Sequence, residues 1–283
     1  MTKNFKIYAI LAIMLIGIAF ASIGCLERNS DTQNIIVKGS DTVLPLSQAE
    51  AEEFMDKYPE KRVTVSGGGS GVGIASMVDG EIDIAMASRE MKQTEIDNAN
   101  QNNVFPIEHT IAWDGIAVVV HPENPVKELT FDQLRGIYNG SISNWEEVGG
   151  EDRRISSITR DSSSGTYAFF REVVLQNDEY RSDALAMSAT GGIVQEVSQN
   201  RGAIGYVGYA YLDQRTHALS LDEGNGYVPP TAESIQSGEY SLARPLYYYT
   251  NGEPEGLTKE FLDFVLGPEG QGIVTEIGYF PAK

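Results

Sequence analysis

The sequence contains few cysteines, few histidines and comparatively few positive charges. Its one cysteine, Cys25, has no partner in the chain, so the fold does not depend on disulfide bonds. The three histidines, His109, His121 and His217, are scattered without the spacing of metal ligands. We therefore expect no metal site, no cofactor and no catalytic histidine.

Positive charge is scarce, because 21 lysines and arginines stand against 40 aspartates and glutamates, and the formal net charge is −19. A nucleic acid needs a basic face, so nucleic acid is not an expected partner. A small anion is not excluded, because the field of distant charges is screened beyond about 10 Å at moderate salt. Donors in direct contact decide such a site, whereas the overall field mainly affects the rate of capture.

One long uncharged run occupies residues 7–24, after Lys3 and Lys6. A basic start, an apolar middle and small residues before Cys25 are typical of an export signal, which we place at residues 1–24. The run is also long enough to span a bilayer, so an uncleaved anchor is the alternative. In either case the folded part is expected outside the cytoplasmic membrane.

The end of this run, "SIGC" (22–25), resembles the lipobox of secreted lipoproteins. The resemblance implies that Cys25 is lipidated and becomes the new N-terminus, although Ser22 stands where leucine is commoner. A buried thiol is the remaining alternative for Cys25. Residues 25–34 are polar and aperiodic, and we interpret them as a lipid-anchored tether on the outer face of the cell membrane.

From residue 35 onward, strands alternate with helices, which is typical of an α/β protein. We expect strands at 35–39, 62–67, 81–88, 115–125, 155–159, 244–250 and in the second half of 191–212. We expect helices at 44–59, 72–80, 130–140 and 167–175, at the start of 191–212, and twice within 257–283. Residues 144–150 are expected to form a surface turn, and 221–240 to be rich in loops.

Three of these strands run into a loop of Gly, Ser and Thr that leads directly into a helix. The loops are "VKGSDTVLPL" (37–46), "VSGGGSGVGI" (65–74) and "ITRDSSSGTYAFF" (158–170). A helix N-terminus has unpaired N–H groups and about half a positive charge, so it attracts anions. The same residues are ordinary helix caps, so one such loop decides nothing. Three in one chain favour a shared anion site.

The amino-acid sequences of these loops argue against other functions. "SGGGSGVGI" (66–74) lacks the Lys-Ser/Thr end of a nucleotide P-loop and the spacing of dinucleotide-binding glycines. Ser164 has no G-x-S-x-G elbow and no histidine obviously placed as its base, so we do not expect a nucleophile.

Two arginines lie at positions where they could supply positive charge to a bound anion. Arg160 opens the third loop, and Arg89 follows Ser88 at the end of an expected strand. A guanidinium group presents forked donors that match two oxygens of a tetrahedral anion. A surface salt bridge is the alternative for either arginine, but strand ends are where α/β sheets bind ligands.

Several of these stretches occur together in a known family. "KGSDTVLPL", "SGGGSGVGI", "DIAMASREMK", "DGIAVVVHPENP" and "RDSSSGTYAFF", in this order, resemble the phosphate-binding lipoproteins of ABC-type phosphate importers. The likeness extends from about residue 35 to the C-terminus. It implies a two-lobed periplasmic-binding-protein type II fold, with two mixed sheets flanked by helices, two crossover strands and a ligand cleft between lobes. Lobe one is expected at 31–113 plus 247–283, and lobe two at 114–246.

The resemblance also implies the ligand contacts. From lobe one these are Thr42, Val43, Ser70, Ser88 and Arg89, and from lobe two Arg160, Ser164, Gly165 and Thr166. Asp161 is expected to brace Arg160. Some family members have an aspartate, which accepts the proton of hydrogen phosphate, where this chain has Arg89. We therefore consider Asp114 and Asp41 as replacements and favour Asp114, for which capping of a nearby loop is the alternative.

The implied function is binding of inorganic phosphate and its delivery to the permease of an ABC transporter, by a monomer that is not an enzyme. Three alternatives stay open. The chain could carry another tetrahedral oxyanion such as sulfate or molybdate, act as a secreted phosphatase, or sense phosphate without transporting it.

Overall fold

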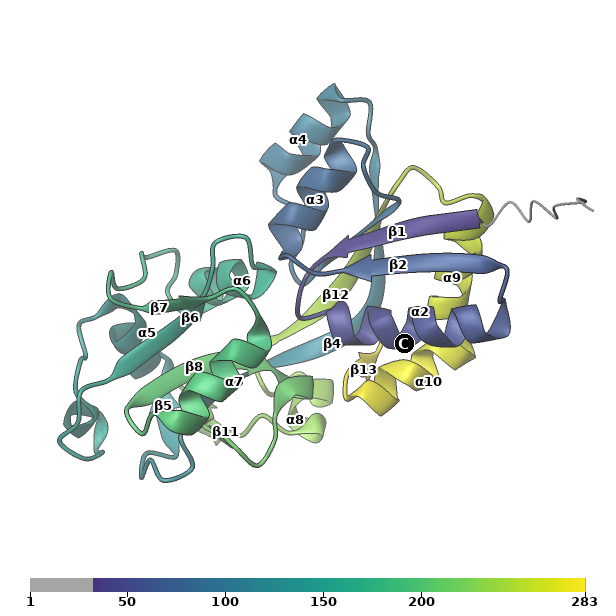
Figure 1. The fold of residues 1–283 in the computed structure, drawn as a ribbon. Coiled ribbons are helices and arrows are strands. Elements are labelled where there is room, and N and C mark those ends of the chain that lie inside the picture. Colours follow the sequence, from purple (N-terminus) through teal and green to yellow (C-terminus); the bar gives the residue numbers. More distant parts are fainter. Residues whose placement is uncertain (1–32, 283) are drawn as a thin grey trace, which may run out of the picture. The chain divides into compact units, whose positions relative to one another are not determined.

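The computed structural model describes residues 33–282, and residues 34–282 belong to one compact unit (Figure 1). The expected signal peptide, Cys25 and the tether up to residue 32 lie outside the described residues. Among the helices of the described chain, none is both long and apolar enough to cross a membrane.

A ten-stranded mixed sheet forms the frame, in the order β2-β1-β3-β12-β4-β8-β6-β7, with β13 and β9 also paired to β4. Its strands are β1 (Gln33–Gly39), β2 (Lys61–Ser66), β3 (Ile84–Ala87), β4 (Pro106–Val120), β6 (Ser156–Arg160), β7 (Leu185–Met187), β8 (Ala203–Gly208), β9 (His217–Ala218), β12 (Ala243–Asn251) and β13 (Phe280–Pro281). A small second sheet contains β5 (Glu128–Thr130), β10 (Ser220–Asp222) and β11 (Tyr227–Val228).

Helices cover the large sheet. They are α2 (Leu44–Lys57), α3 (Ser70–Val78), α4 (Gln93–Gln101), α5 (Phe131–Asn139), α6 (Gly165–Val173), α7 (Thr190–Gln199), α8 (Ala232–Ser237), α9 (Gly256–Leu266) and α10 (Pro268–Ile277), with short 3₁₀ turns η1 (Trp145–Val148) and η2 (Tyr209–Tyr211). Figure 1 shows α2, α9 and α10 together on one face of β1 and β2, and α3 with α4 on the other. Helix α7 packs on β6 and β8, and α6 contacts β6.

Strands β4 and β12 connect the two halves of the sheet. Strand β12 pairs with β3 on one side and antiparallel with β4 on the other. The carboxyl half of β4 then pairs with β8. The two expected crossover strands are therefore confirmed, and "YYY" (247–249) lies in one of them. The two expected mixed sheets are the halves of one continuous sheet, because β4 belongs to both.

The buried apolar side chains form four clusters. Two draw their members from residues 35–112 and 246–279. The other two draw theirs from residues 116–242, and Phe280 joins one of these. The change between the two groups falls inside β4 and between residues 242 and 246, where β12 begins.

Helix α5 shows how local sequence sets helix ends. The Gln133 N–H donates to Thr130 Oγ1 at 3.2 Å, and the Thr130 N–H donates to Gln133 Oε1 at 2.9 Å. Gly140 follows in the left-handed conformation, with φ at 90°. This reciprocal capping box and glycine end are both present in "TFDQLRGIYNG", so the helix expected at 130–140 is confirmed.

Some expected elements differ from the structure. Strand β3 begins at Ile84 and is buried on both faces, so the expected alternation from residue 82 is wrong. Residues 144–150 contain η1, whose Trp145 is buried, so this turn is anchored in the core. Strand β4 starts at Pro106, before its expected start at 115.

Candidate functional site

The first and third loops meet through two threonine hydroxyl groups. Thr42 lies just before α2, and Thr166 lies in the first turn of α6. Their Oγ1 atoms are 2.8 Å apart, and both side chains are buried. The Val43 N–H at the same helix start donates to the Ser40 carbonyl at 3.1 Å. The N-termini of α2 and α6 are therefore adjacent.

The second loop joins the same place. The Gly71 N–H, in the first turn of α3, donates to the Ser163 carbonyl at 2.9 Å. The Ser88 N–H donates to Ser70 Oγ at 3.1 Å, and the Ser40 hydroxyl donates to Ser88 Oγ at 2.9 Å. Three helix N-termini thus converge on one group of buried hydroxyls, as the sequence predicted. We call Ser40, Thr42, Ser70, Ser88, Ser164 and Thr166 the hydroxyl cluster.

Gly165 is required by this convergence. A Cβ atom at Gly165 would lie 2.3 Å from Ser70 Oγ and 2.6 Å from Ser88 Oγ. Only a residue without a side chain lets the first peptide group of α6 come this close to both serines. Ser164 precedes it as the N-cap, and its Oγ accepts from the Tyr167 N–H at 3.3 Å.

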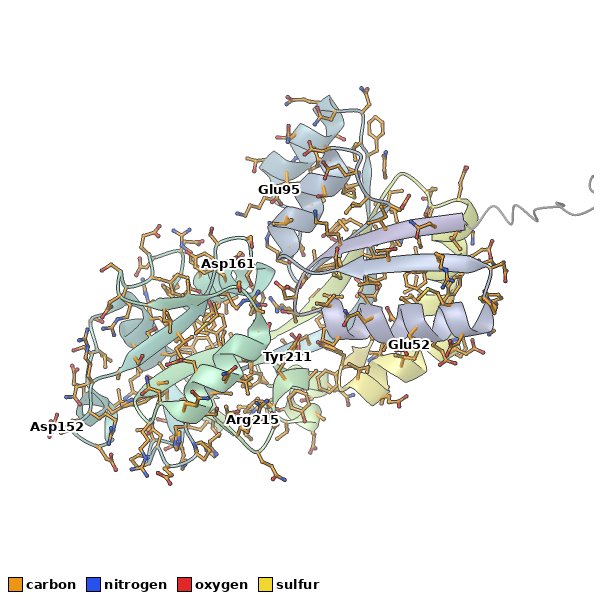
Figure 2. The ribbon with its side chains drawn as sticks, viewed as in Figure 1. Glu52, Glu95, Asp152, Asp161, Tyr211 and Arg215 are labelled. Atoms are coloured by element: carbon orange, nitrogen blue, oxygen red, sulfur yellow. The ribbon has the colours of Figure 1, made fainter. Side chains whose placement is uncertain are left out.

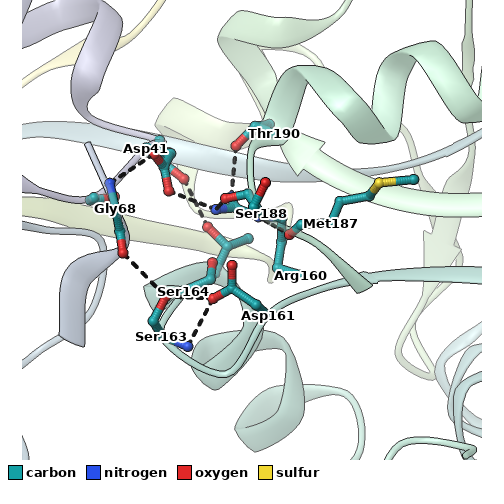
Figure 3. Close-up of polar contacts among 12 residues, drawn as sticks. Asp41, Gly68, Arg160, Asp161, Ser163, Ser164, Met187, Ser188 and Thr190 are labelled. Atoms are coloured by element: carbon teal, nitrogen blue, oxygen red, sulfur yellow. Dashed lines mark hydrogen bonds and ion pairs between the residues drawn. The ribbon is translucent and has the colours of Figure 1, made fainter. Parts of the chain in front are cut away.

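Arg160 is buried beside the cluster and is held by four contacts (Figure 3). Its Nη2 donates to Asp41 Oδ2 at 2.8 Å and to the Ser188 carbonyl at 2.9 Å. Its Nε donates to the Met187 carbonyl at 3.1 Å, and Nη1 donates to Thr190 Oγ1 at 2.8 Å. A guanidinium group has five N–H donors, so these contacts leave one N–H on Nη1.

Asp161 does not brace Arg160, and this expectation was wrong. Asp161 Oδ1 accepts from the Ser163 N–H at 2.9 Å and from the Ser163 hydroxyl, so it shapes the third loop. The carboxylate paired with Arg160 is Asp41, whose other oxygen accepts from the Gly68 N–H at 3.1 Å. Asp41 therefore links all three loops, which its position in the first loop did not reveal.

Arg89 is paired within its own part of the fold. Its Nη1 and Nη2 donate to the two carboxylate oxygens of Glu95 at 2.8 and 2.7 Å. Figure 2 shows Glu95 on α4. Burial is the largest single influence and raises the pKa of Glu95, but the hydrogen bonds from Arg89 and from the Lys92 N–H, together with the charges of both residues, lower the pKa overall. The forked donors of Arg89 thus face Glu95, and the structure gives Arg89 no hydrogen bond to the hydroxyl cluster.

A buried pair of opposite charges lies on the crossover strands. Asp114 of β4 and Arg244 of β12 are register partners, and Arg244 Nη2 is 3.6 Å from Asp114 Oδ2. Asp114 Oδ1 accepts from the Tyr209 N–H at 3.1 Å. Burial raises the pKa of Asp114 to about 6, against the opposing effect of Arg244. Arg244 Nη2 also donates to Thr166 Oγ1 at 2.7 Å, so this pair adjoins the cluster.

Sequence reasoning missed Arg244. The stretch "RPLYYYT" (244–250) is typical of a strand. The one feature that could have marked Arg244 as a site residue was its charge next to an apolar strand core. Arg244 also lines a cavity of about 420 Å³, whose other walls include Arg89, Tyr167, Phe169 and Tyr247. In the part of the chain that the structure describes, no group of three or more His, Cys, Asp or Glu side chains is placed to hold a metal ion.

Comparison with known proteins supports the family that the sequence motifs resemble. The family described as the PBP superfamily domain matches residues 27–269. The chain is 33% identical to the phosphate-binding protein PstS of Bacillus subtilis, over 99% of this chain and 95% of that protein. It is also 33% identical to PstS of Staphylococcus epidermidis, over 86% of this chain and 77% of that protein.

Solved structures agree with these relatives. A substrate-binding protein from Clostridium perfringens with bound phosphate has 34% identity and a TM-score of 0.82, over 89% of this chain and 100% of that one. An ABC-type phosphate transport receptor from Vibrio cholerae has 32% identity and a TM-score of 0.73, over 88% of this chain and 100% of that one. The chain therefore belongs to the PBP superfamily and, within it, to the phosphate-binding proteins that these relatives represent.

Proposed function

We propose that this chain binds inorganic phosphate outside the cytoplasmic membrane and delivers it to an ABC-type phosphate transporter. The observation that carries the proposal is the convergence of α2, α3 and α6, which aims three helix N-termini and several buried hydroxyls at one place. The names of the relatives support the choice of phosphate. They are binding proteins, and the chain is a carrier rather than an enzyme.

The two lobes are proposed at residues 31–113 plus 247–283 and at 114–246. The division of the buried clusters within β4 and at the start of β12 supports these boundaries. Several contacts then join the lobes at the site, among them Thr42 with Thr166, Asp41 with Arg160 and Gly71 with Ser163. A phosphate ion that contacts both lobes stabilises the closed arrangement, because it makes both sets of contacts only there.

The proposed phosphate-binding residues are Thr42, Val43, Ser70, Ser88, Arg89, Asp114, Arg160, Ser164, Gly165 and Thr166. Within this set Arg160 supplies a buried guanidinium group that four contacts hold in place, and we assign its remaining N–H to the anion. Arg89 has an outer role, since it lines the neighbouring cavity and is paired with Glu95.

Asp114 is the proposed acceptor for the proton of hydrogen phosphate. Both oxygens of Asp41 are engaged, one by Arg160 and one by the Gly68 N–H. Asp114 Oδ2, in contrast, is buried and has no hydrogen-bond partner within the described chain. An acceptor of this kind favours phosphate, which keeps a proton near neutral pH, over sulfate, which does not.

Three further parts of the proposal concern the cell envelope. We propose that Cys25 carries a lipid, that this lipid anchors the protein to the outer face of the membrane, and that the closed form docks on the permease. The sequence of residues 7–25 and the relatives' function support them.

Titration calorimetry tests the function. The purified protein should bind phosphate, and bind sulfate and molybdate much more weakly. Replacing Arg160 with Met should weaken phosphate binding by at least about 2 kcal/mol, roughly thirtyfold in Kd, because a buried charged contact is lost. Arg171→Met is the matched control, since Arg171 is bonded to Glu179 at the surface. Preferential binding of sulfate, or no binding of any oxyanion, would refute the proposal.

A further inference from the structure

Arg244 differs from the other two arginines near the site in how its donors are used. Arg89 donates two N–H groups to Glu95, and Arg160 donates one to Asp41, at 2.7–2.8 Å. Arg244 makes one short contact, to Thr166, and its Nε and Nη1 have no hydrogen-bond partner in residues 33–282. Because buried polar groups are nearly always bonded, a buried guanidinium with spare donors beside an anion site needs an explanation.

The contact to Thr166 has a fixed direction. A guanidinium group has donors and no acceptor, so Thr166 Oγ1 must accept from Arg244 Nη2 at 2.7 Å. The Thr166 hydroxyl hydrogen then points elsewhere, to Thr42 Oγ1 at 2.8 Å or to an anion at the cluster. When Thr166 donates to Thr42, the hydrogen of Thr42 is free in turn. Arg244 thus leaves hydroxyl hydrogens, rather than lone pairs, facing a bound anion.

The guanidinium is held firmly enough for this role. Asp114 lies beside it in register across β4 and β12, with both side chains almost fully buried. The guanidinium group also lies over the ring of Phe169, with Arg244 Cζ 5.3 Å from the ring centroid. At 3.6 Å from Asp114, Arg244 keeps more of its positive field than it would in a close ion pair.

We propose that Arg244 is a positioning residue of the anion site, which acts from a crossover strand by fixing the Thr166 hydroxyl as a donor. The inference rests on the proposed function and adds a specificity-determining residue to it. A phosphate oxygen that accepts from the Thr166 hydroxyl is then favoured in its unprotonated form. The proton of hydrogen phosphate is therefore placed on a different phosphate oxygen.

A double-mutant cycle tests this role by phosphate titration of four proteins: wild type, Arg244→Met, Thr166→Val and the double variant. If Arg244 acts through Thr166, each single change weakens binding at least tenfold, and the double variant is weakened no more than the worse single one. Arg244→Lys keeps one donor and the charge, and it should recover part of the affinity lost in Arg244→Met. Arg171→Met, in the wall of the same cavity, should bind as wild type does.

A second comparison guards against misfolding. Losing Arg244 alone leaves Asp114 unpaired, so Asp114→Asn/Arg244→Met is compared with Asp114→Asn, and thermal unfolding without phosphate is recorded for each. The double change should bind phosphate at least tenfold more weakly than Asp114→Asn. Equal binding by these two folded proteins, or losses in the cycle that multiply, would overturn the inference. If the wild-type protein binds no phosphate, both the proposed function and this inference are refuted. If the wild-type protein binds phosphate and the losses in the cycle are additive, only the role of Arg244 is refuted.

Discussion

Asp114 illustrates how one buried carboxyl group can separate two similar anions. Its Oδ2 has no hydrogen-bond partner among the described residues and lies 3.6 Å from Arg244 Nη2, and burial raises the pKa of this carboxyl group to about 6. If it accepts the proton of hydrogen phosphate, Asp114→Asn should reduce the preference for phosphate over sulfate at least about tenfold, because a charged hydrogen bond and a repulsive contact disappear together. Competitive titration with both anions measures this ratio. An unchanged ratio would leave Asp114 as a cap for the Tyr209 N–H only.

Glu50 in α2 is a second buried carboxyl group. Burial raises its pKa to about 8, against the opposing hydrogen bond from Tyr248. The Tyr248 oxygen is 2.9 Å from Glu50 Oε2 and 2.6 Å from Ser47 Oγ. Tyr248 has one hydrogen for two contacts, so it must accept in one of them, either from the Ser47 hydroxyl or from a protonated Glu50.

The pH dependence of stability should report this proton. The folded protein keeps it up to about pH 8, whereas the unfolded chain releases it near 4.5. The free energy of unfolding is therefore expected to fall as pH rises between these values, by up to about 1.4 kcal/mol per pH unit. Glu50→Gln should remove this slope, in urea unfolding at pH 5, 6.5 and 8. An equal slope in both proteins would show that Glu50 is ionised in the core.

At this scale the sequence predicted that the three loops come together, but it did not predict all of the contacts that their residues make. The loops that hold Thr42, Ser70 and Thr166 could be found because helix starts with Gly, Ser and Thr have a local signature. The partner of Arg160 could not be predicted, because Asp41 and Asp161 are both aspartates of the site loops. Which of them pairs with Arg160 depends on the folded conformation of those loops. Arg244 was missed because a strand residue's neighbours come from other segments.

At the scale of elements, the first turn of α6 packs tightly against two serines of the site. A Cβ at Gly165 would lie 2.3 Å from Ser70 Oγ, whereas one at Gly191 in α7 would meet nothing within 4 Å. Gly165→Ala should therefore weaken phosphate binding by at least about tenfold, since α6 or the serines must shift, and overpacking of this kind costs about 1–3 kcal/mol. Gly191→Ala is the matched control and should bind normally.

Titration of both alanine variants, with their melting temperatures, checks this prediction. Normal binding by Gly165→Ala would mean that the approach of α6 to α3 is not needed for phosphate.

Elements with a strong local signal were predicted well, and those set by packing were not. Helix α5 has a capping box and a glycine end, and it was found within a residue at each end. Helix α4 was not predicted, because "QTEIDNANQ" has few apolar residues and only Ala99 is fully buried. The first half of β4 has exposed and half-buried residues, so it lacks the apolar run that marked the second half.

At the scale of the whole molecule, the net charge of −19 sets how phosphate arrives. Like charges repel at long range, and salt screens them, whereas the contacts inside the site are short and buried. The association rate should therefore rise roughly two- to tenfold between low and moderate ionic strength, with a smaller change in the dissociation rate. Stopped-flow fluorescence measures both rates. A rate that falls with salt would show that the field at the cleft is positive.

The two-lobed class could be predicted from the order of the motifs along the chain, and the relatives confirm it. The continuity of the sheet across the two halves could not be predicted. Strand pairing across β4 joins segments more than 80 residues apart, such as those of Ile116 and Gly208.

The most direct test of the central claim is a crystal structure with arsenate, a phosphate analogue whose arsenic scatters anomalously. The account predicts one strong arsenic peak within hydrogen-bonding distance of Thr42, Ser70 and the first turn of α6. A peak elsewhere, with those helix starts free of arsenic, would contradict it.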